Sequence, residues 1–247
     1  MEKYYIAYLD FLGAKVKIKN NFSETYNNLE YIYEKLIKFL EKENELEKYG
    51  NIYPEIKINL FSDNIAIFTK KQGKASEFEI LLKTISYIQA IALKKGFPMR
   101  GGISEGDFAF KSCKNKNNNL IADFILGNSL VEAVHLEENL AIYPRVILSP
   151  EINYNSYLNY LRVDNDGFRY VEYFSSLYKE FKKEAKSPIQ TPAQIKNLLE
   201  QLYKNEAKHN KNYKIIQKYN WLIDKYNNYC LEQNWDMYKI KLNMLLS

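Results

Sequence analysis

The sequence has little of what secreted proteins, membrane-spanning proteins or proteins with cysteine-based metal sites require. It contains two Cys in 247 residues, Cys113 and Cys230, which lie far apart and lack the spacing of a metal or redox site. No apolar run is long enough to cross a bilayer, and the N-terminus has no basic-then-apolar signal pattern. We therefore expect a protein of the reducing cytoplasm, with inert thiols and no membrane partner.

Arginine is equally scarce, since only four of the 35 basic residues are Arg. The chain has no arginine-rich tail and no basic stripe interleaved with aromatic residues, so we expect no nucleic-acid partner. Its formal net charge of +5 suits an anionic small ligand. Because Lys is the usual cation here, an Arg such as Arg100 suggests a need for a planar, bidentate donor.

The chain does have enough apolar material for a substantial core. Hydrophobic residues make up 46% of it, with 22 Tyr and 13 Phe. Its length favours one domain, or one domain with an appendage. Beyond about residue 178 the composition shifts to Lys, Asn, Gln and Tyr at helical spacing. We predict a sheet domain over residues 1–177 and a C-terminal helical extension over residues 178–247, packed on the core.

Hydrophobic periodicity predicts the order β-α-β-β-α-β for the first part of the chain. The predicted segments are a strand at 3–9, a helix at 23–47, a hairpin with strands at 55–61 and 64–69, a helix opened by a Ser76–Glu79 capping box and ending near Gly96, and a strand from 99. A strand at 120–126, a helix at 128–138 and strands at 143–149 and near 168–174 follow. This order is typical of a ferredoxin-like α+β fold, an antiparallel sheet with both helices on one face.

Each of two predicted strands carries a single carboxylate at one end. Asp10 ends the first strand, and Asp63 lies in the turn of the hairpin. The ferredoxin-like order brings these two ends together, and adjacent carboxylates repel each other unless a divalent cation lies between them. We therefore predict a site for Mg²⁺ or Mn²⁺, suited to two-metal phosphoryl chemistry. Structural roles are the alternative, since Ser-Asp-Asn is ordinary turn chemistry and Asp10 could simply end a strand.

Four motifs between residues 4 and 150 resemble, in order, those of class III nucleotidyl cyclases, whose fold is a palm-like ferredoxin-like sheet. They are "LDFLG" (9–13), "LFSDNIAIF" (60–68), "RGGISEG" (100–106) and "DFILGNSLVEAVHLEENLAIYPRVILS" (123–149). In the second motif Ser62 replaces the Gly of the family's Gly-Asp turn. Each motif is weak alone, and the four in sequence are fairly specific.

The resemblance implies a role for each matched residue. Asp10, Asp63 and the backbone carbonyl of Phe11 would bind two Mg²⁺ or Mn²⁺ ions. Backbone N–H groups of the loop Phe11-Leu12-Gly13 would approach the phosphates, which Gly13 makes sterically possible. Arg100 would grip the β- and γ-phosphates that leave as pyrophosphate, and Gly101 and Gly102 beside it could be bulge residues.

Two regions depart from the family pattern. The Lys or Glu that reads the base is replaced by Asn59, whose amide cannot select a purine by charge. The family's Asn and Arg on the next helix correspond to Val131 and His135. His135 and Asn128 are the substrate-binding candidates there, although a lone His on a helix is more often packed or at the surface.

These departures, with "KYNWLIDKYNNY" at 218–229, resemble the bacterial pyrimidine cyclases of Pycsar anti-phage systems. The resemblance implies conversion of UTP or CTP to the 3′,5′-cyclic monophosphate and pyrophosphate. It also implies a homodimer with sites at the subunit interface, and a separate effector protein that the product activates. The sequence leaves two alternatives open: a purine cyclase or cyclic-oligonucleotide synthase of the same fold, and a degenerate sensor that binds a nucleotide without turnover.

Overall fold

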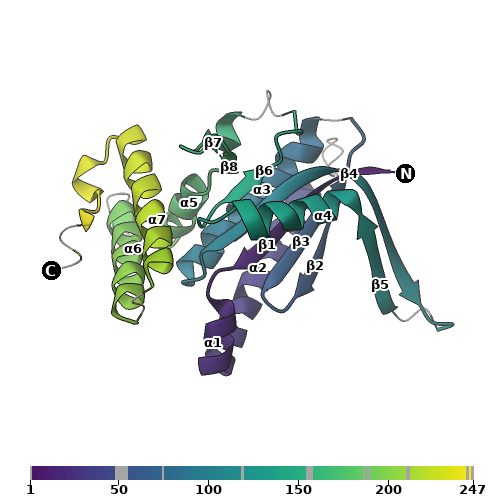
Figure 1. Ribbon diagram of the computed structural model, residues 1–247, viewed down its shortest axis with the longest axis horizontal. Coiled ribbons are helices and arrows are strands. Elements are labelled where there is room, and N and C mark those ends of the chain that lie inside the picture. The colour runs from purple at the N-terminus through teal and green to yellow at the C-terminus, as the bar shows by residue number, and fades with distance from the viewer. Residues whose placement is uncertain are drawn as a thin grey trace.

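The computed structural model describes residues 2–47, 55–73, 75–117, 120–153, 158–185, 187, 190–209, 212–242 and 245. Figure 1 shows a central sheet with helices on both faces and the pair α6 and α7 at one end. The strands are β1 (Lys3–Phe11), β2 (Ile56–Phe61), β3 (Asn64–Lys70), β4 (Met99–Lys114), β5 (Leu120–Gly127), β6 (Val146–Leu148), β7 (Leu161–Val163) and β8 (Arg169–Val171).

The helices are α1 (Ala14–Asn20), α2 (Phe22–Glu47), α3 (Ala75–Lys94), α4 (Asn128–His135), α5 (Phe174–Lys182), α6 (Gln190–His209) and α7 (Tyr213–Glu232). A π-helical turn, η1 (Leu136–Leu140), continues α4, and two 3₁₀ turns are η2 (Leu158–Tyr160) and η3 (Asp236–Tyr238). Over the residues described, no helix is both long enough and apolar enough to cross a membrane.

The main sheet has the strand order β2-β3-β1-β4-β6-β8-β7, and β5 pairs with the far end of β4. β1 lies between β3 and β4 and is antiparallel to both, whereas β6 is parallel to β4. The order β2-β3-β1-β4 is the one that a ferredoxin-like sheet requires. The predicted α+β ferredoxin-like core with appended C-terminal helices is therefore confirmed.

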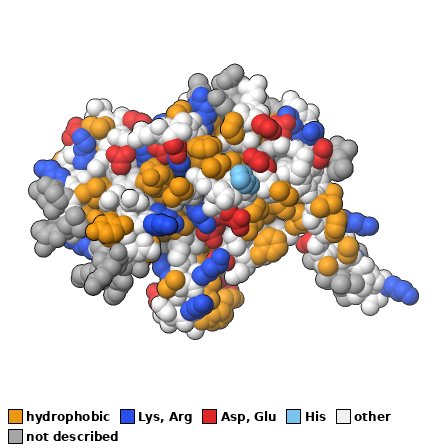
Figure 2. Space-filling model, viewed as in Figure 1, with side chains coloured by type: hydrophobic (Ala, Val, Ile, Leu, Met, Phe, Trp, Pro, Cys, Tyr) orange, Lys and Arg blue, Asp and Glu red, His pale blue; other side chains and the backbone are white. Residues whose placement is uncertain are grey.

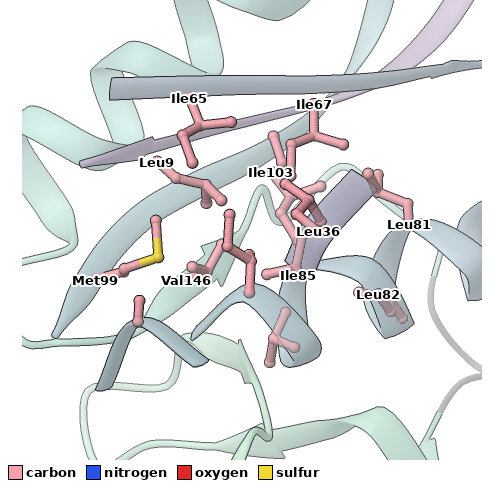
Figure 3. Close-up of a cluster of buried hydrophobic side chains, with 14 of the residues drawn as sticks. Leu9, Leu36, Ile65, Ile67, Leu81, Leu82, Ile85, Met99, Ile103 and Val146 are labelled. Atoms are coloured by element: carbon pink, nitrogen blue, oxygen red, sulfur yellow. The ribbon is translucent and has the colours of Figure 1, made fainter. Parts of the chain in front are cut away.

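The sheet buries a different set of side chains on each face, because successive residues of a strand point in opposite directions. One face packs against α2 and α3, with Leu9, Ile65 and Ile103 in its buried cluster, as Figure 3 shows. The other face packs against α4 through a smaller cluster that includes Ile6 and Phe68. Both predicted helices thus lie on one face, and α4 covers the opposite one (Figure 1).

The C-terminal helices share a hydrophobic cluster with the sheet domain. Leu177, Leu199 and Leu222 of α5, α6 and α7 pack in one buried cluster with Leu93 of α3 and Ile147 of β6. α5 runs from Phe174 to Lys182 and so spans the predicted boundary between residues 177 and 178.

A buried ionic network also ties α7 to the sheet. Arg145, which is 1% exposed, contacts the carboxylates of Asp164 and Asp166. From α7, Lys225 Nζ lies 2.9 Å from Asp164 Oδ1, and Trp221 Nε1–H donates to Asp164 Oδ2 at 2.7 Å. Two successive turns of α7 are therefore fixed to one carboxylate.

Several boundaries differ from the sequence-based prediction. The short helix α1 was not predicted, because only Ala14 of its seven residues is buried and no apolar stripe marks it. The Ser76–Glu79 capping box is wrong: Ser76 lies inside α3, and Glu77 instead accepts the backbone N–H of Gln72 at 2.7 Å. β6 begins only at Val146, since Pro144 has no N–H for a ladder.

The glycines of β4 allow a close helix approach and do not form a bulge. Gly101 and Gly102 pair in unbroken register with Leu9 and Tyr8, which corrects the expectation of bulge residues. A Cβ on Gly102 would lie 2.4 Å from the Cβ of Leu136 and 2.5 Å from the backbone oxygen of Ala133. Only a residue without a side chain lets α4 and η1 pack this closely on β4.

Substituting Gly102→Ala should therefore destabilise the protein by about 1–3 kcal/mol, the usual cost of overpacking a core against backbone. The free energy of unfolding from urea titration measures this. Gly106→Ala is the matched control on the same strand, because its nearest neighbour is the side-chain amide oxygen of Asn128, which can rotate away. Equal losses in the two variants would contradict the assignment.

Candidate active site

The end of β1 and the tip of the β2–β3 hairpin lie side by side. Asp10 pairs with Asn64 of β3 on one side and with Arg100 of β4 on the other. The backbone N–H of Phe11 donates to the backbone oxygen of Asp63 at 3.0 Å. Asp63 is 3% exposed although it lies in a turn. The two carboxylates are thus brought to the same end of the sheet.

The turn that holds Asp63 has the backbone shape that glycine adopts most readily. Ser62 has φ 52°, in the left-handed region that glycine adopts without steric cost. Tyr33 O–H from α2 donates to the backbone oxygen of Ser62 at 3.4 Å. The turn keeps the left-handed shape even though Ser62 replaces the Gly.

Arg100 bridges two carboxylates in this structure. Its Nε–H donates to Asp10 Oδ2 at 3.3 Å, and its Nη2 lies 2.6 Å from Glu137 Oε1. Glu137 is 3% exposed and lies in the π-helical turn η1. Sequence reasoning missed Glu137 as a site residue. Its only signal in the sequence is its position in "LEENL", directly after the helix that has Val131 and His135 where the motifs of class III cyclases have Asn and Arg.

Burial dominates the electrostatics of this cluster. Desolvation raises the pKa of Asp10, and the neighbouring Arg100 guanidinium partly opposes that rise. Desolvation likewise raises the pKa of Glu137 to about 7, again against the effect of Arg100. Lys15 Nζ of α1 lies 3.8 Å from Asp63 Oδ2, so each buried acid has a cation beside it.

The loop after β1 differs in part from the sequence-based expectation. The N–H groups of Phe11 and Leu12 donate to the backbone oxygens of Asp63 and Pro98 at 3.0 and 2.8 Å. They are already used within the fold, which corrects the expectation that they would bind phosphate. Gly13 has φ 80°, and no atom lies within 4 Å of the position where its Cβ would stand. The loop is therefore open at Gly13.

The other predicted substrate-binding residues form a second group. Asn59 lies on β2, two strands away from β1, at the level of Tyr8 and on the same face of the sheet as Asp10. Asn128 begins α4 with its amide against Gly106, and exposed His135 ends α4 beside Asn139. Among the residues described, no hydrogen bond or ion pair joins Asn59, Asn128 or His135 to Asp10 or Asp63.

The residues at the end of β1 can supply only part of the coordination shell of a hard divalent cation. Across the described part of the chain, no group of three or more His, Cys, Asp or Glu side chains could hold a metal ion. Mg²⁺ is often held by one or two carboxylates, with waters and substrate phosphates completing its shell. Asp10, Asp63 and the Phe11 carbonyl supply such a partial donor set. The donors suit a metal that arrives with a phosphorylated substrate.

Comparisons with known proteins add no further support. No protein-family model matches this chain, and no curated protein matches it either. The resemblance to class III cyclases therefore stays a prediction from the quoted motifs, and the site has to be judged on its own geometry.

The raised pKa of Glu137 predicts a pH dependence of stability. A carboxylate whose folded pKa lies above the ordinary 4.5 destabilises the fold progressively as pH rises from 4.5 through 7. Glu137→Gln removes that ionisation, so it should stabilise the metal-free protein at pH 8 relative to pH 5. We expect the difference in unfolding free energy between variant and wild type to change by of the order of 1–3 kcal/mol.

Thermal or urea denaturation in EDTA at the two pH values measures this difference. Glu138→Gln, on the exposed neighbour, is the control and should show little change. A Glu137→Gln effect that is the same at pH 5 and pH 8 would contradict the prediction.

Proposed function

We propose that this protein is a nucleotidyl cyclase that converts a pyrimidine triphosphate, UTP or CTP, to its 3′,5′-cyclic monophosphate. The observation that carries the proposal is the convergence of Asp10, Asp63 and Arg100. They come from β1, the β2–β3 turn and β4, and they meet at one end of a ferredoxin-like sheet. Two acids and a planar cation at one point suit a triphosphate and its metal ions.

In the proposed reaction the ribose 3′-oxygen bonds to the α-phosphorus, the bond from that phosphorus to the bridging oxygen breaks, and pyrophosphate leaves. The 3′-hydroxyl proton passes to solvent. Asp10, Asp63 and the Phe11 carbonyl would hold two Mg²⁺ or Mn²⁺ ions, which neutralise phosphate charge and lower the pKa of the hydroxyl. No protein nucleophile is required, because positioning and charge neutralisation carry the step.

Arg100 links metal binding to phosphate binding in this scheme. Its Nε–H now donates to Asp10, and its Nη2 lies against Glu137. An ion bound to Asp10 would neutralise much of its charge, so it would weaken the contact of Asp10 with one edge of the guanidinium. Glu137 would keep the other edge oriented. The edge beside Asp10 then suits the oxygens of the leaving pyrophosphate, which a guanidinium binds in bidentate fashion.

A homodimer is part of this proposal, and the second group of residues supports it. Asn59 lies two strand spacings, roughly 10 Å, from β1 and has no recorded contact with its own Asp10 in the described residues. Large apolar side chains are exposed nearby on β5 and α4, with Phe124 52%, Leu126 63% and Val131 70% exposed. In Figure 2, hydrophobic side chains lie on the arm that β5 and the end of β4 form at the side of the molecule. A second copy would cover them and bring its own Asn59 to the site.

The effector protein and the role in anti-phage defence rest on the sequence resemblance alone, and the cytoplasmic location rests on the scarcity of cysteine and of long apolar runs. Pyrimidine selection also rests on the resemblance, because Asn59 does not decide the base. The amide of Asn59 can both donate and accept, which matches the mixed edges of uracil and cytosine as well as it matches a purine.

A nucleotide-binding sensor without turnover is the second candidate. It is favoured by α4, where the family Asn position is the exposed apolar Val131 and the family Arg position is His135, which hydrogen-bonds with Asn139. Without a donor at Val131 the ribose would be held less firmly. The paired acids beside Arg100 favour the enzyme.

The first experiment incubates the protein with Mn²⁺ and each of the four ribonucleoside triphosphates separately, and identifies products by mass spectrometry. We expect a cyclic monophosphate from UTP or CTP. Asp10→Asn and Asp63→Asn should each reduce the rate at least 100-fold, because each removes a metal ligand while keeping the side-chain shape.

Asp236→Asn is the matched control, since that carboxylate is 72% exposed on η3 and pairs with Lys239. A cyclic product from ATP or GTP instead would identify the protein as a purine cyclase. Triphosphate binding without any product would overturn the enzyme and favour the sensor. Equal activity in the Asp63→Asn protein would remove Asp63 from the site.

The dimer makes a separate prediction. Leu126→Asp and Val131→Asp should each give monomers by sedimentation velocity, with an unchanged far-ultraviolet spectrum and loss of activity. Met237→Asp, at a 78% exposed apolar residue elsewhere, should leave the dimer intact.

Mixing two inactive proteins, Asp63→Asn and Asn59→Ala, tests whether the sites are shared. A heterodimer of these variants carries one intact site if Asn59 serves the partner, so activity should return on mixing. Two inactive variants that stay inactive after subunit exchange would contradict a shared site.

A further inference from the structure

The C-terminal helix α7 brings a cation to the loop that follows β1. A cavity of about 180 Å³ is lined by Leu12 and Gly13 of that loop, and by Lys218 and Tyr219 of α7. Pro98, Pro144, Glu206 and Ile215 complete its wall. Gly13 is also the point where the loop is open. The cavity therefore joins the candidate active site to the helical extension.

Lys218 has a different environment from that of an ordinary surface lysine. Its side chain is half-buried, and within the described residues it makes no hydrogen bond or ion pair. Desolvation lowers its pKa, and so does the positive charge of Arg100, while Asp10 and Glu137 raise it. Lys218 therefore lies close enough to the candidate active site to sense all three charges.

The acid in the cavity wall is already compensated. Burial and the negative charge of Glu206 raise the pKa of Tyr219, and the same charge opposes the fall in the Lys17 pKa that burial causes. The Lys17 ammonium in turn donates to the backbone oxygen of Gly96 and lies over the ring of Phe97. Among the described residues, Lys218 contacts no carboxylate directly, and Asp10 and Glu137 act on it only from a distance.

We propose that Lys218 binds the terminal phosphates of the triphosphate, so that α7 completes the pyrophosphate subsite from the same chain. This rests on the proposed function. A partly desolvated ammonium without a partner is costly, and a phosphate oxygen supplies the charge-assisted hydrogen bond that it lacks. Gly13 leaves room for the phosphates between the loop and α7. Lys218 is then a binding residue that acts on the same leaving group as Arg100.

The test uses pyrophosphate as the probe, because it contains the proposed contact and no base or ribose. Binding is measured by calorimetry with Mn²⁺ on the full-length protein, and steady-state kinetics follow for the triphosphate that proves to be the substrate. Lys218→Ala should weaken pyrophosphate binding 10- to 100-fold, as expected for loss of one hydrogen bond to a charged group. It should raise KM by a similar factor and change kcat less than threefold.

Two further variants separate binding from folding. Lys214→Ala removes an exposed lysine one turn earlier on α7 and should leave both constants unchanged. Lys218→Arg keeps the charge and should bind pyrophosphate with an affinity within about threefold of the wild type. Lys218→Met keeps the apolar stem and should match Lys218→Ala in binding while melting at the wild-type temperature.

The outcomes distinguish this inference from the proposed function. If the wild type makes a cyclic nucleotide and Lys218→Ala keeps its pyrophosphate affinity, the inference fails and the function stands. If no triphosphate is cyclised but pyrophosphate binding depends on Lys218, the Lys218 subsite is supported and the proposed cyclase activity is rejected. Failure of the wild type to bind pyrophosphate at all would overturn the inference, whatever the activity.

Discussion

The position of β1 between two antiparallel neighbours is the constraint on which the rest of the structure depends. Hydrogen bonds to β3 and β4 fix its register on both sides, so a shift by one residue would move Leu9 to the α4 face and turn Tyr8 and Asp10 into the cluster under α2 and α3. Ile6 and Leu9 then enter two different buried clusters. Asp10 is left at the strand end, facing the side of Arg100, and the buried turn at Asp63 is held to Phe11.

Much of this fold could be predicted from the sequence because the signals are local and periodic. The strands of the first half, the hairpin at Asp63 and the apolar stripe of α2 all follow from residue spacing. The juxtaposition of Asp10 and Asp63 follows from topology. Glu137 could not be found in this way, since its contact with Arg100 depends on a π-helical turn that no spacing rule predicts. Lys218 was equally hidden, because a tertiary packing choice brings α7 to the loop.

The candidate site has acids and cations in alternation within a poorly solvated region. Arg100 lies between Asp10 and Glu137, and Lys15 lies beside Asp63. In such a region each charge is stabilised chiefly by its neighbours, because water contributes little. Ligands that bring both signs, as a metal-bound triphosphate does, can replace these internal pairs without leaving a charge unmatched. A ligand that carries charge of one sign only would leave a buried charge of the protein without its counter-charge.

The carboxylate of Asp164 has a consequence for how this protein can change over time. It binds Arg145 before β6 and also Trp221 and Lys225 of α7, so strand, turn and helix meet at one residue. The helical extension is therefore not an interchangeable module. A chimaera that exchanges α7 for that of a distant relative would have to exchange the turn around Asp164 with it. Amino-acid changes in one of these two segments therefore restrict the changes that the other can accept.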